Sequence, residues 1–488
     1  MTRWWENRWA IAAIIIATTI PLWFVTVPPL IDLVGHMGRY HIQISLDDVP
    51  ALQANWDYHW RLIGNLGGDL LMEGLGRIFG VERGSVIFAG LILAVMMSGM
   101  VRLARAAHGT VPATAWAAFP FAMSYPWQYG LVNYWLGVGL ALHATAWGWK
   151  VERRRWAYFA LVSLPLWVAH IYGWAVFAVL MGAHAVAGRP WKDWLRQMPL
   201  LLPLTLPAFV MHALNYGQKG AETQGWLDFG YKAYALIWTL RDQHQWFDMG
   251  CLVAATVLIY AGFRSKSFIV DKGLSLGALG LFVSLLIIPY QLVGSAYADA
   301  RLWPVIFIVA LLAIRPADRD GKLSARLATA AAAIFAIRIA ATTIGFQGYA
   351  ADYDRHFQAL NLMARGSRVA VFTEFPCDVP WRRPRLDHLD GIAIVRRDVF
   401  TNGQWDVPGA QMLVPLGAKG TRYNADPSQF IMGCGDLRPG LAKRIAKFPR
   451  DRFQFVWLIG YRPETLPRYG GLTPIFADDR TILYRIDR

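Results

Sequence analysis

Residues 9–42 read WAIAAIIIATTIPLWFVTVPPLIDLVGHMGRYHI, an apolar run followed directly by a run rich in ionisable side chains. The apolar part, residues 9–27, is about as long as a membrane-spanning helix and is preceded by Arg3 and Arg8. No small-residue cleavage site follows it, so we interpret it as a retained transmembrane helix rather than a signal peptide. Pro28 and Pro29 end this helix, and the ionisable run begins beyond them.

The composition extends this reading to the whole chain. Of its 488 residues 55% are hydrophobic and 17% are charged, whereas an ordinary soluble domain has about 25% charged residues. An ordinary water-soluble enzyme and a disordered chain are therefore both excluded. The net charge of +15 would suggest nucleic acid in a soluble protein. Here many Lys and Arg lie in short loops between apolar runs, where they orient helices in a membrane, so no nucleic-acid partner is expected.

The apolar runs predict a polytopic α-helical membrane protein with about eleven transmembrane helices. Alternate loops are basic, which places those loops and the N-terminus in the cytoplasm and the C-terminus outside. Several runs are shorter than a full crossing, which predicts tilted or broken helices. The predicted spans are residues 9–27, 84–104, 111–125, 130–148, 156–168, 170–187, 198–214, 249–263, 273–290, 302–315 and 326–345.

Three longer segments fall on the outer side: residues 31–83, residues 215–248 and the C-terminal part. We expect a membrane domain over residues 1–345 and a small extracytoplasmic α/β domain over residues 346–488. Its predicted strands are residues 368–373, 391–395, 411–415, 453–459 and 481–486, with a helix near residues 441–447.

The C-terminal segment contains two cysteines, Cys377 and Cys434. In an oxidising periplasm these two can form a disulfide. The alternative is a pair of unlinked thiols in the core of the domain.

The richest candidate site is the stretch after the first helix. If it is helical, Asp32, His36, Arg39 and Gln43 share one face. The Asp32 carboxylate can accept a proton from an acceptor hydroxyl, and the Arg39 guanidinium can bind a phosphate with two hydrogen bonds. The alternative is an amphipathic interfacial helix whose polar face is merely in contact with water.

More acidic residues follow in the same outer loop. Asp47 and Asp48 are further candidate bases. Either of them, or Asp57, could join Asp32 or His36 in binding Mg²⁺ or Mn²⁺. No fixed ligand spacing supports a metal, so solvated loop acids are the simpler interpretation. Residues 62–80 form an amphipathic pattern that predicts a helix on the outer leaflet.

Polar residues at the ends of the predicted spans form a second group of candidates. Arg301 and Arg338 could bind a lipid phosphate. The alternatives are a local ion pair of Asp299 with Arg301, an Arg338 side chain that snorkels to the interface, and a packing role for His170. The candidate substrate-pocket residues are Tyr125, Asn133, His170, Tyr172 and Asp299.

Several common catalytic motifs are missing from the sequence. It contains no Walker A loop, GxGxxG, HExxH, CxxC pair or GxSxG elbow. ATP-driven transport, dinucleotide chemistry and serine hydrolysis therefore lack their usual signatures.

The chain resembles the GT-C superfamily of integral membrane glycosyltransferases, which includes oligosaccharyltransferases, protein mannosyltransferases and lipid A aminoarabinose transferases. The resemblance lies in an acid just after the first helix, a long first outer loop and an extracytoplasmic C-terminal domain. More narrowly, several segments are similar to those of bacterial multi-pass proteins grouped with that superfamily. They are PPLIDLVGHMGR, NLGGDLL, NYWLGVGLAL, HIYGW, ARLWP and HLDGIAIVRRDVF.

This resemblance implies a polyprenyl-phosphate sugar donor and an acceptor activated by the first-loop carboxylate, which Asp32 matches. His36 and Arg39 match the His and Arg that follow the acid in the narrower group. Val34 and Gly35 replace an expected Pro and Asn, which puts the local turn in question. Asp47 and Asp48 look like the paired acids of some members.

The leading hypothesis is a bacterial inner-membrane glycosyltransferase acting on an envelope glycan, lipid or protein. Its partners would be the donor lipid, that acceptor and membrane lipids. One rival is a transporter or flippase of lipid-linked sugars, which would often show internal repeats; no duplication is evident. Another is a non-catalytic assembly protein of a polysaccharide export system.

Overall fold

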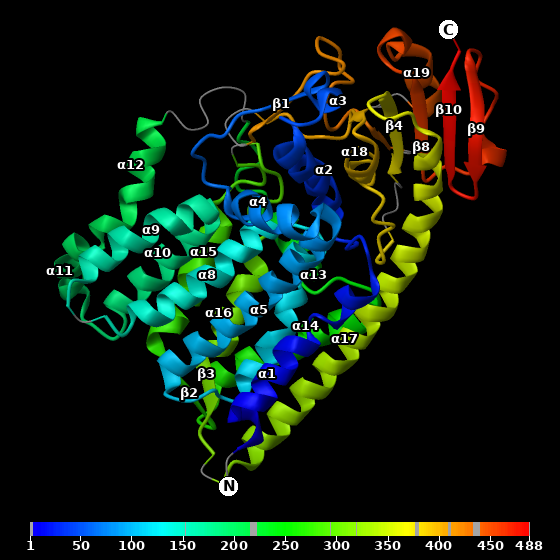
Figure 1. The fold of residues 1–488 in the computed structure, drawn as a ribbon. Helices are drawn as coiled ribbons and strands as arrows, with labels where there is room; N and C mark the ends of the chain where they lie inside the picture. The colour runs from blue at the N-terminus through cyan, green and yellow to red at the C-terminus, as the bar shows by residue number, and fades with distance from the viewer. Residues whose placement is uncertain are drawn as a thin grey trace. The chain divides into compact units, whose positions relative to one another are not determined.

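The computed structural model describes residues 3–151, 153–214, 222–292, 294–318, 320–375, 380–407, 411–432 and 440–487. The chain forms two compact units. A helical unit comprises Met1–Trp23, Leu62–Gly68 and Ala89–Ile344, and a sheet unit comprises Phe24–Arg61, Asp69–Phe88 and Gly345–Arg488. The predicted first outer loop thus contributes most of its residues to the same unit as the C-terminal segment (Figure 1).

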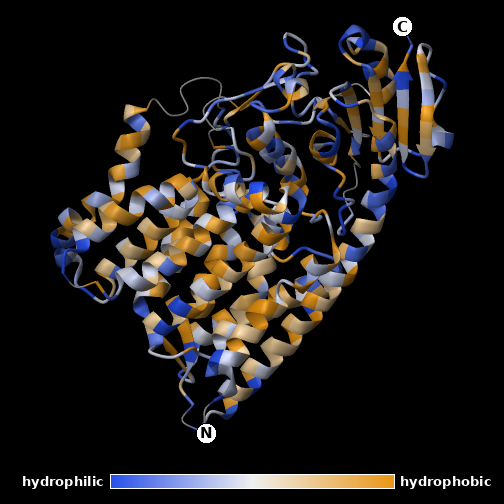
Figure 2. Ribbon diagram, in the orientation of Figure 1, coloured by the Kyte–Doolittle hydropathy of each residue, from blue (hydrophilic) through white to orange (hydrophobic). Residues whose placement is uncertain are grey.

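The helical unit has the apolar composition of a membrane protein (Figure 2). Among the described residues, three helices are long and apolar enough to cross a membrane: α5 (Val81–His108), α14 (Gln245–Arg264) and the helical stretch that begins with α17 (Lys322–Phe357). Five apolar helical stretches are shorter: Arg8–Phe24, which contains α1 (Arg8–Ala17), then α9 (Arg155–Ala169), α10 (Ile171–Val186), α15 (Lys272–Ile287) and α16 (Leu302–Ala313). The figure of eleven crossings stays a prediction.

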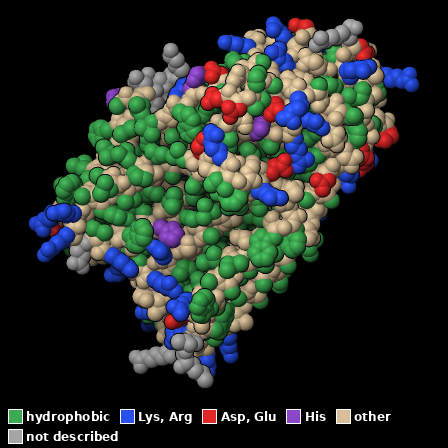
Figure 3. All heavy atoms as spheres, in the orientation of Figure 1, with side chains coloured by type: hydrophobic (Ala, Val, Ile, Leu, Met, Phe, Trp, Pro, Cys, Tyr) green, Lys and Arg blue, Asp and Glu red, His purple; other side chains and the backbone are tan. Residues whose placement is uncertain are grey.

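The packing separates central helices from peripheral ones. Only 22% of the apolar stretch of α14 that is long enough to cross a membrane is buried inside the protein. By contrast, α16 is buried along nearly its whole length. α10 packs against α8 (Val132–Gly148) and α15, and α15 packs against α16. Hydrophobic side chains cover most of the visible face of the helical unit, as Figure 3 shows. An apolar outer surface of this extent is suited to lipid.

Three predicted spans are interrupted rather than continuous. The expected helix over residues 9–27 is divided into α1 and η2 (Ile20–Phe24), with Pro21 in the second part. The expected helix over residues 111–125 is instead divided into α6 (Thr114–Ala118) and η3 (Phe119–Met123), and α7 (Tyr125–Gln128) follows. The expected helix over 198–214 is likewise divided among α11 (Trp191–Leu201), η4 (Leu202–Thr205) and α12 (Leu206–Ala213). Prolines account for the breaks, because proline cannot donate the helical hydrogen bond and its ring clashes with the preceding turn. The prolines are Pro21, Pro120, Pro126, Pro199, Pro203 and Pro207.

The sheet unit is built on a sheet with strand order β5-β4-β8-β10-β9, in which β7 also pairs with β4. β4 runs parallel to β5, β7 and β8, whereas β10 runs antiparallel to β8 and β9. The strands are β4 (Arg368–Phe375), β5 (Phe400–Thr401), β7 (Phe430–Met432), β8 (Phe455–Ile459), β9 (Leu472–Asp478) and β10 (Thr481–Ile486). Every residue of β8 is buried, which fits its central position in the sheet between β4 and β10.

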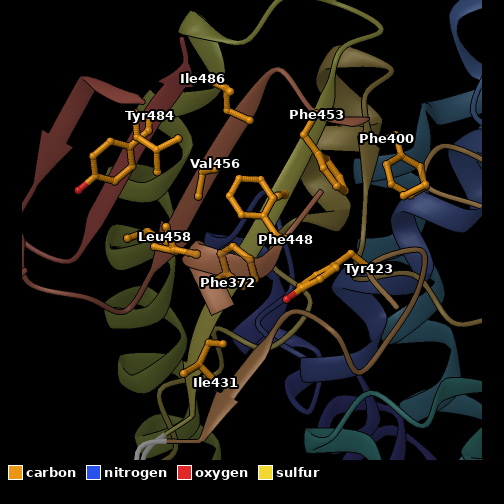
Figure 4. Packing of buried hydrophobic residues seen from close by; sticks show 14 of the residues in the cluster. Phe372, Phe400, Tyr423, Ile431, Phe448, Phe453, Val456, Leu458, Tyr484 and Ile486 are labelled. Atoms are coloured by element: carbon orange, nitrogen blue, oxygen red, sulfur yellow. The ribbon is translucent and has the colours of Figure 1, made fainter. Parts of the chain in front are cut away.

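An aromatic and aliphatic core lies on this sheet. Phe372 of β4 lies 6.0 Å from Phe448 between ring centroids, and Phe448 lies 6.1 Å from Phe453. Val456 and Leu458 of β8 complete the cluster (Figure 4). The helix α19 (Leu441–Lys447) contributes Leu441 and Ile445 to the same core, so the predicted helix near residues 441–447 is confirmed.

Residues 391–395 were expected to form a strand, and this prediction is wrong: Gly391–Arg397 is the helix α18. A short apolar run does not distinguish a strand from a buried helical turn, and here packing against α2 (Ile31–Ser45) decides for the helix. Residues 413–415 do form a strand, β6 (Leu413–Pro415), which pairs with β1 (Trp56–Tyr58) outside the main sheet.

The sheet unit also contains elements from the first loop. They are α2, α3 (Pro50–Gln53), β1 and most of α4 (Gly67–Phe79). The helix predicted over residues 62–80 is therefore present as α4. Cys377 and Cys434 lie outside the described residues, so their pairing stays a prediction.

Candidate active site

The helix α2 carries the principal candidate residues. It begins at Ile31, just beyond the two prolines, and places Asp32 in its first turn, where the helix dipole favours a negative charge. The prediction that this stretch is helical is confirmed. Asp32 and His36 are half-buried, whereas Arg39 and Gln43 are buried.

Arg39 forms a buried ion pair with α4. Its Nη2 lies 3.1 Å from Oδ1 of Asp69, with both side chains at most 3% exposed, and its Nη1 donates to Oε1 of Gln411. Burial alone would lower the pKa of Arg39, but Asp69, Tyr40 and Tyr58 together outweigh burial, and the pKa is raised. The position suits a residue that holds α2 in place, and a phosphate could reach Arg39 only in competition with Asp69.

Gln43 continues the contact between α2 and α4 one turn later. Its Nε2 donates to Oε2 of Glu73 at 2.7 Å and to the carbonyl of Asp69 at 3.0 Å. Tyr58 of β1 donates to Oε1 of Gln43 at 3.0 Å. Arg39 and Gln43, which form the C-terminal part of the predicted polar face of α2, are therefore both engaged in contacts within the sheet unit.

The N-terminal part of that face, which contains Asp32 and His36, contacts the C-terminal segment. Three aromatic rings lie together there. The ring of Trp405 lies 4.8 Å from that of His36 and 4.3 Å from that of His388, between centroids. Gly35 makes this contact possible, because a Cβ at this position would come within 2.7 Å of the Trp405 ring and 3.0 Å of Cβ of His388. The glycine that departs from the expected pattern thus has a packing function.

His388 lies among carboxylates. Burial opposes protonation, but Asp426, Asp32, Asp390 and Asp387 outweigh it and raise the pKa of His388. For His36 burial acts together with Arg39 and His388, and the pKa is lowered well below its usual value. The site therefore holds a neutral His36 at neutral pH, and the carboxylates around His388 shift its titration to higher pH.

Two of the carboxylates have raised pKa values. Burial raises the pKa of Asp390 although Thr401 donates a 2.6 Å hydrogen bond to its Oδ2. Burial also raises the pKa of Asp426 against the opposing influence of His388. Groups with shifted pKa values are common at functional sites.

Sequence reasoning did not single out His388, Asp390, Trp405 or Asp426 as site residues. The segment HLDGIAIVRRDVF, which contains His388 and Asp390, carried part of the family resemblance and was the available signal. Nothing in the spacing of the chain indicates that residue 388 lies against residue 35.

The acids between α2 and α4 are solvated. Asp47 and Asp48 are exposed in the turn after α2, and Asp57 pairs with His59 at 2.7 Å with both side chains exposed. Among the described residues, no three His, Cys, Asp or Glu side chains are placed to hold a metal ion. The possible Mg²⁺ or Mn²⁺ site considered for the first loop therefore has no set of three such ligands among these residues.

In the helical unit, the structure brings together four of the residues at span ends. The guanidinium of Arg301 lies 5.8 Å from the ring centroid of Tyr134 and 6.0 Å from that of Tyr172. Its Nη2 donates to Oγ of Ser295 and to the carbonyl of Ala296. His170 caps α10 by accepting a hydrogen bond from the backbone N–H of Tyr172.

Asp299 pairs with Lys232 and not with Arg301, so the alternative of a local Asp299–Arg301 ion pair is wrong. Its Oδ2 accepts a 2.6 Å hydrogen bond from Nζ of Lys232 in α13 (Phe229–Ile237), and both side chains are buried. Lys232 also donates to the carbonyl of Ile288. The buried lysine fixes the loop before α16, a structural task that needs no substrate.

Arg338 does not snorkel to the interface. It is buried, and its Nη1 donates to Oδ1 of Asp248 at 2.8 Å while its Nη2 donates to the carbonyl of Leu240 at 2.7 Å. Asp248 in turn accepts from the backbone N–H of Asp242. A phosphate-binding role for Arg338 would require this network to open.

The last two pocket candidates have local partners. Asn133 accepts from the backbone N–H of Gly68 and donates to Asn65, so it holds the first turn of α4 and the residues just before it. Tyr125 is buried among aromatic rings and lies 5.1 Å from Tyr129 and 6.4 Å from Tyr297.

This fold agrees with the family resemblance of the sequence. It is shared by the crystal structure of ArnT from Cupriavidus metallidurans in the apo state, with a TM-score of 0.51 and 12% sequence identity over 97% of this chain and 96% of that chain. The structure of the same ArnT bound to undecaprenyl phosphate has a TM-score of 0.46 and 12% identity over 98% of each chain. No family model matches the sequence, and no curated protein matches it.

Proposed function

We propose that this protein is a glycosyltransferase of the bacterial inner membrane that transfers a sugar from a polyprenyl-phosphate donor to an envelope glycan, lipid or protein. The GT-C fold supports the general class. The observation that carries the proposal is the position of Asp32, half-buried on α2 beside the cluster of His36, Trp405 and His388.

In the proposed step, the Asp32 carboxylate accepts the proton of an acceptor hydroxyl. The acceptor oxygen attacks the anomeric carbon of the donor, and a new C–O bond forms as the bond to phosphate breaks. Polyprenyl phosphate leaves with the electron pair. The donor already carries a leaving group, so the reaction needs a base, positioning and charge stabilisation but no nucleotide.

His388 suits the role of a positioning residue for Asp32. Asp32 is one of the carboxylates that raise the pKa of His388, and the attraction is reciprocal. A protonated His388 therefore favours the ionised carboxylate that a general base requires. His36, held neutral, adds no competing charge on the same helix.

Arg301 is the best remaining candidate for binding the donor phosphate. Arg39 and Arg338 each pair with a buried carboxylate. Among the described residues, Arg301 has hydroxyl and carbonyl partners but no carboxylate partner, and its Nε lacks a hydrogen-bond partner. A buried cation of this kind favours an anion.

The experiment is a transfer assay with the purified protein in lipid nanodiscs and labelled polyprenyl-phosphate sugars carrying hexoses, hexosamines or aminopentoses. The proposal predicts release of polyprenyl phosphate with a glycosylated product. Movement of intact donor across vesicles without bond cleavage would instead support the flippase alternative and contradict the proposal.

A further inference from the structure

A polar hollow lies in the sheet unit next to the cluster of His36, Trp405 and His388, which we call the His388 cluster. It has a volume of about 700 Å³, and its walls include Asp406, Asp426, Arg422, Arg444, Asn424 and Thr421. This volume falls within the range of about 300–1,000 Å³ of small-molecule sites. All of its described walls belong to the C-terminal segment.

The wall that contains Thr421 and Asn424 is held rigid by its own hydrogen bonds. The side chain of Asn424 accepts from the backbone N–H of Ala418 and donates to the carbonyl of Pro415. Thr421 donates to the carbonyl of Ala418. These side chains therefore fix the loop, and the ionic side chains of the hollow are the ones that can serve a ligand.

Those ionic side chains are two carboxylates and two guanidinium groups, from Asp406, Asp426, Arg422 and Arg444. Arg444 is buried, and its Nη1 lies 3.4 Å from the carbonyl of Ser428, whereas Asp406 and Arg422 are exposed. Carboxylates only accept hydrogen bonds from hydroxyls, and guanidinium groups only donate to them. A mixed set of this kind matches a ligand that presents many hydroxyl groups, each both donor and acceptor.

The hollow is connected to the helix of Asp32 by two consecutive hydrogen bonds. The side chain of Gln404 donates to the carbonyl of Gly35 in α2 at 2.9 Å. The carbonyl of Gln404 accepts from the backbone N–H of Asp426 at 2.9 Å. The next residue, Trp405, lies against His36 and His388, and the one after it, Asp406, lines the hollow.

We propose that this hollow binds a sugar unit of the acceptor, so that the acceptor of this protein is a glycan or glycolipid. The inference rests on the proposed transferase function and names the substrate class of that site. Asp406 and Arg422 contact the sugar hydroxyls, and Asp426 joins the hollow to the His388 cluster.

The test is saturation-transfer NMR on the full-length protein in nanodiscs. The probes are methyl glycosides of hexoses, 6-deoxyhexoses, N-acetylhexosamines and hexuronic acids. At least one glycoside is expected to bind saturably, and Arg422→Ala and Asp406→Ala should each weaken its binding at least about tenfold, which corresponds to about 1.4 kcal/mol. Both positions are exposed, so these variants should fold.

The matched control is Arg485→Ala. Arg485 is an exposed arginine in a separate hollow of about 510 Å³ that is also lined by Ser367 and Gln454 of the same unit. This variant should bind the glycoside as the wild type does. If no glycoside binds to the wild type, or if the Arg422 and Asp406 variants bind like the control, the proposal is overturned.

The design separates this inference from the transferase function. Asp32→Asn should keep the glycoside affinity within about twofold of wild type while transfer is lost. Glycoside binding without transfer from any donor would contradict the transferase but leave a sugar site. Transfer that proceeds with an unchanged acceptor KM in Arg422→Ala would contradict the sugar site alone.

Discussion

Gly391 of α18 lies directly against the carbonyl of Val34 in α2. A Cβ at residue 391 would come within 2.2 Å of that oxygen and 3.0 Å of Cα of Gly35. The helix that carries Asp32 is therefore positioned by contact with the C-terminal segment of the sheet unit.

Gly391→Ala should accordingly disturb α2, because backbone atoms cannot move away as a flexible side chain can. We expect an overpacking cost of about 1–3 kcal/mol and a lower rate of sugar transfer, measured by thermal unfolding and by the transfer assay. Gly440→Ala is the control, since a Cβ there meets nothing within 4 Å. Equal behaviour of the two variants would show that the α2–α18 contact is not tight.

Breaking the Arg39–Asp69 pair should destabilise the protein strongly. Removing one partner of a buried ion pair typically costs about 3–5 kcal/mol because the other charge is left unpaired. We expect Arg39→Met to lower the unfolding temperature, and the double variant with Asp69→Leu to recover part of the loss. The control is Arg77→Ala, which removes an exposed pair with Glu73 and should cost less than about 1 kcal/mol.

Arg338→Ala should act on stability rather than on donor binding. Arg338 bridges Asp248 and the carbonyl of Leu240, and Arg338→Lys should rescue little because one ammonium does not reproduce the two-armed contact. The measurements are thermal unfolding and the donor KM of the folded fraction. A donor KM raised tenfold with unchanged unfolding would instead assign the phosphate to Arg338.

The pH dependence of stability should report on His388. Its folded pKa is raised, so its contribution to stability is fully present below the ordinary value of about 6.5 and is lost as the pH rises through the folded value. The excess stability of wild type over His388→Asn should therefore shrink on going from pH 6 to pH 9. An excess that grows with pH would contradict a protonated His388 among the carboxylates.

The local part of this site could be predicted from the sequence, because helical periodicity alone places Asp32, His36 and Arg39 on one face. The partners could not. Asp69 meets Arg39 and His388 approaches Gly35 only through tertiary packing, and hydropathy does not specify which distant segments meet.

The same limit explains the errors in the fold. Apolarity suggested unbroken spans over 9–27, 111–125 and 198–214, where prolines interrupt the helices. It also suggested a strand at 391–395, where contact with α2 favours a helix. Arg338 illustrates a further case, since its partner Asp248 is 90 positions away in the sequence.

The central claim is that Asp32 is the base of sugar transfer, and its most direct test compares Asp32→Asn with Asp47→Asn in the transfer assay. Loss of a general base typically lowers the rate by about 10²–10⁴-fold. We predict a loss of this size for Asp32→Asn with unchanged unfolding, and a rate near wild type for Asp47→Asn, whose carboxylate is exposed. Full transfer by Asp32→Asn would contradict the account.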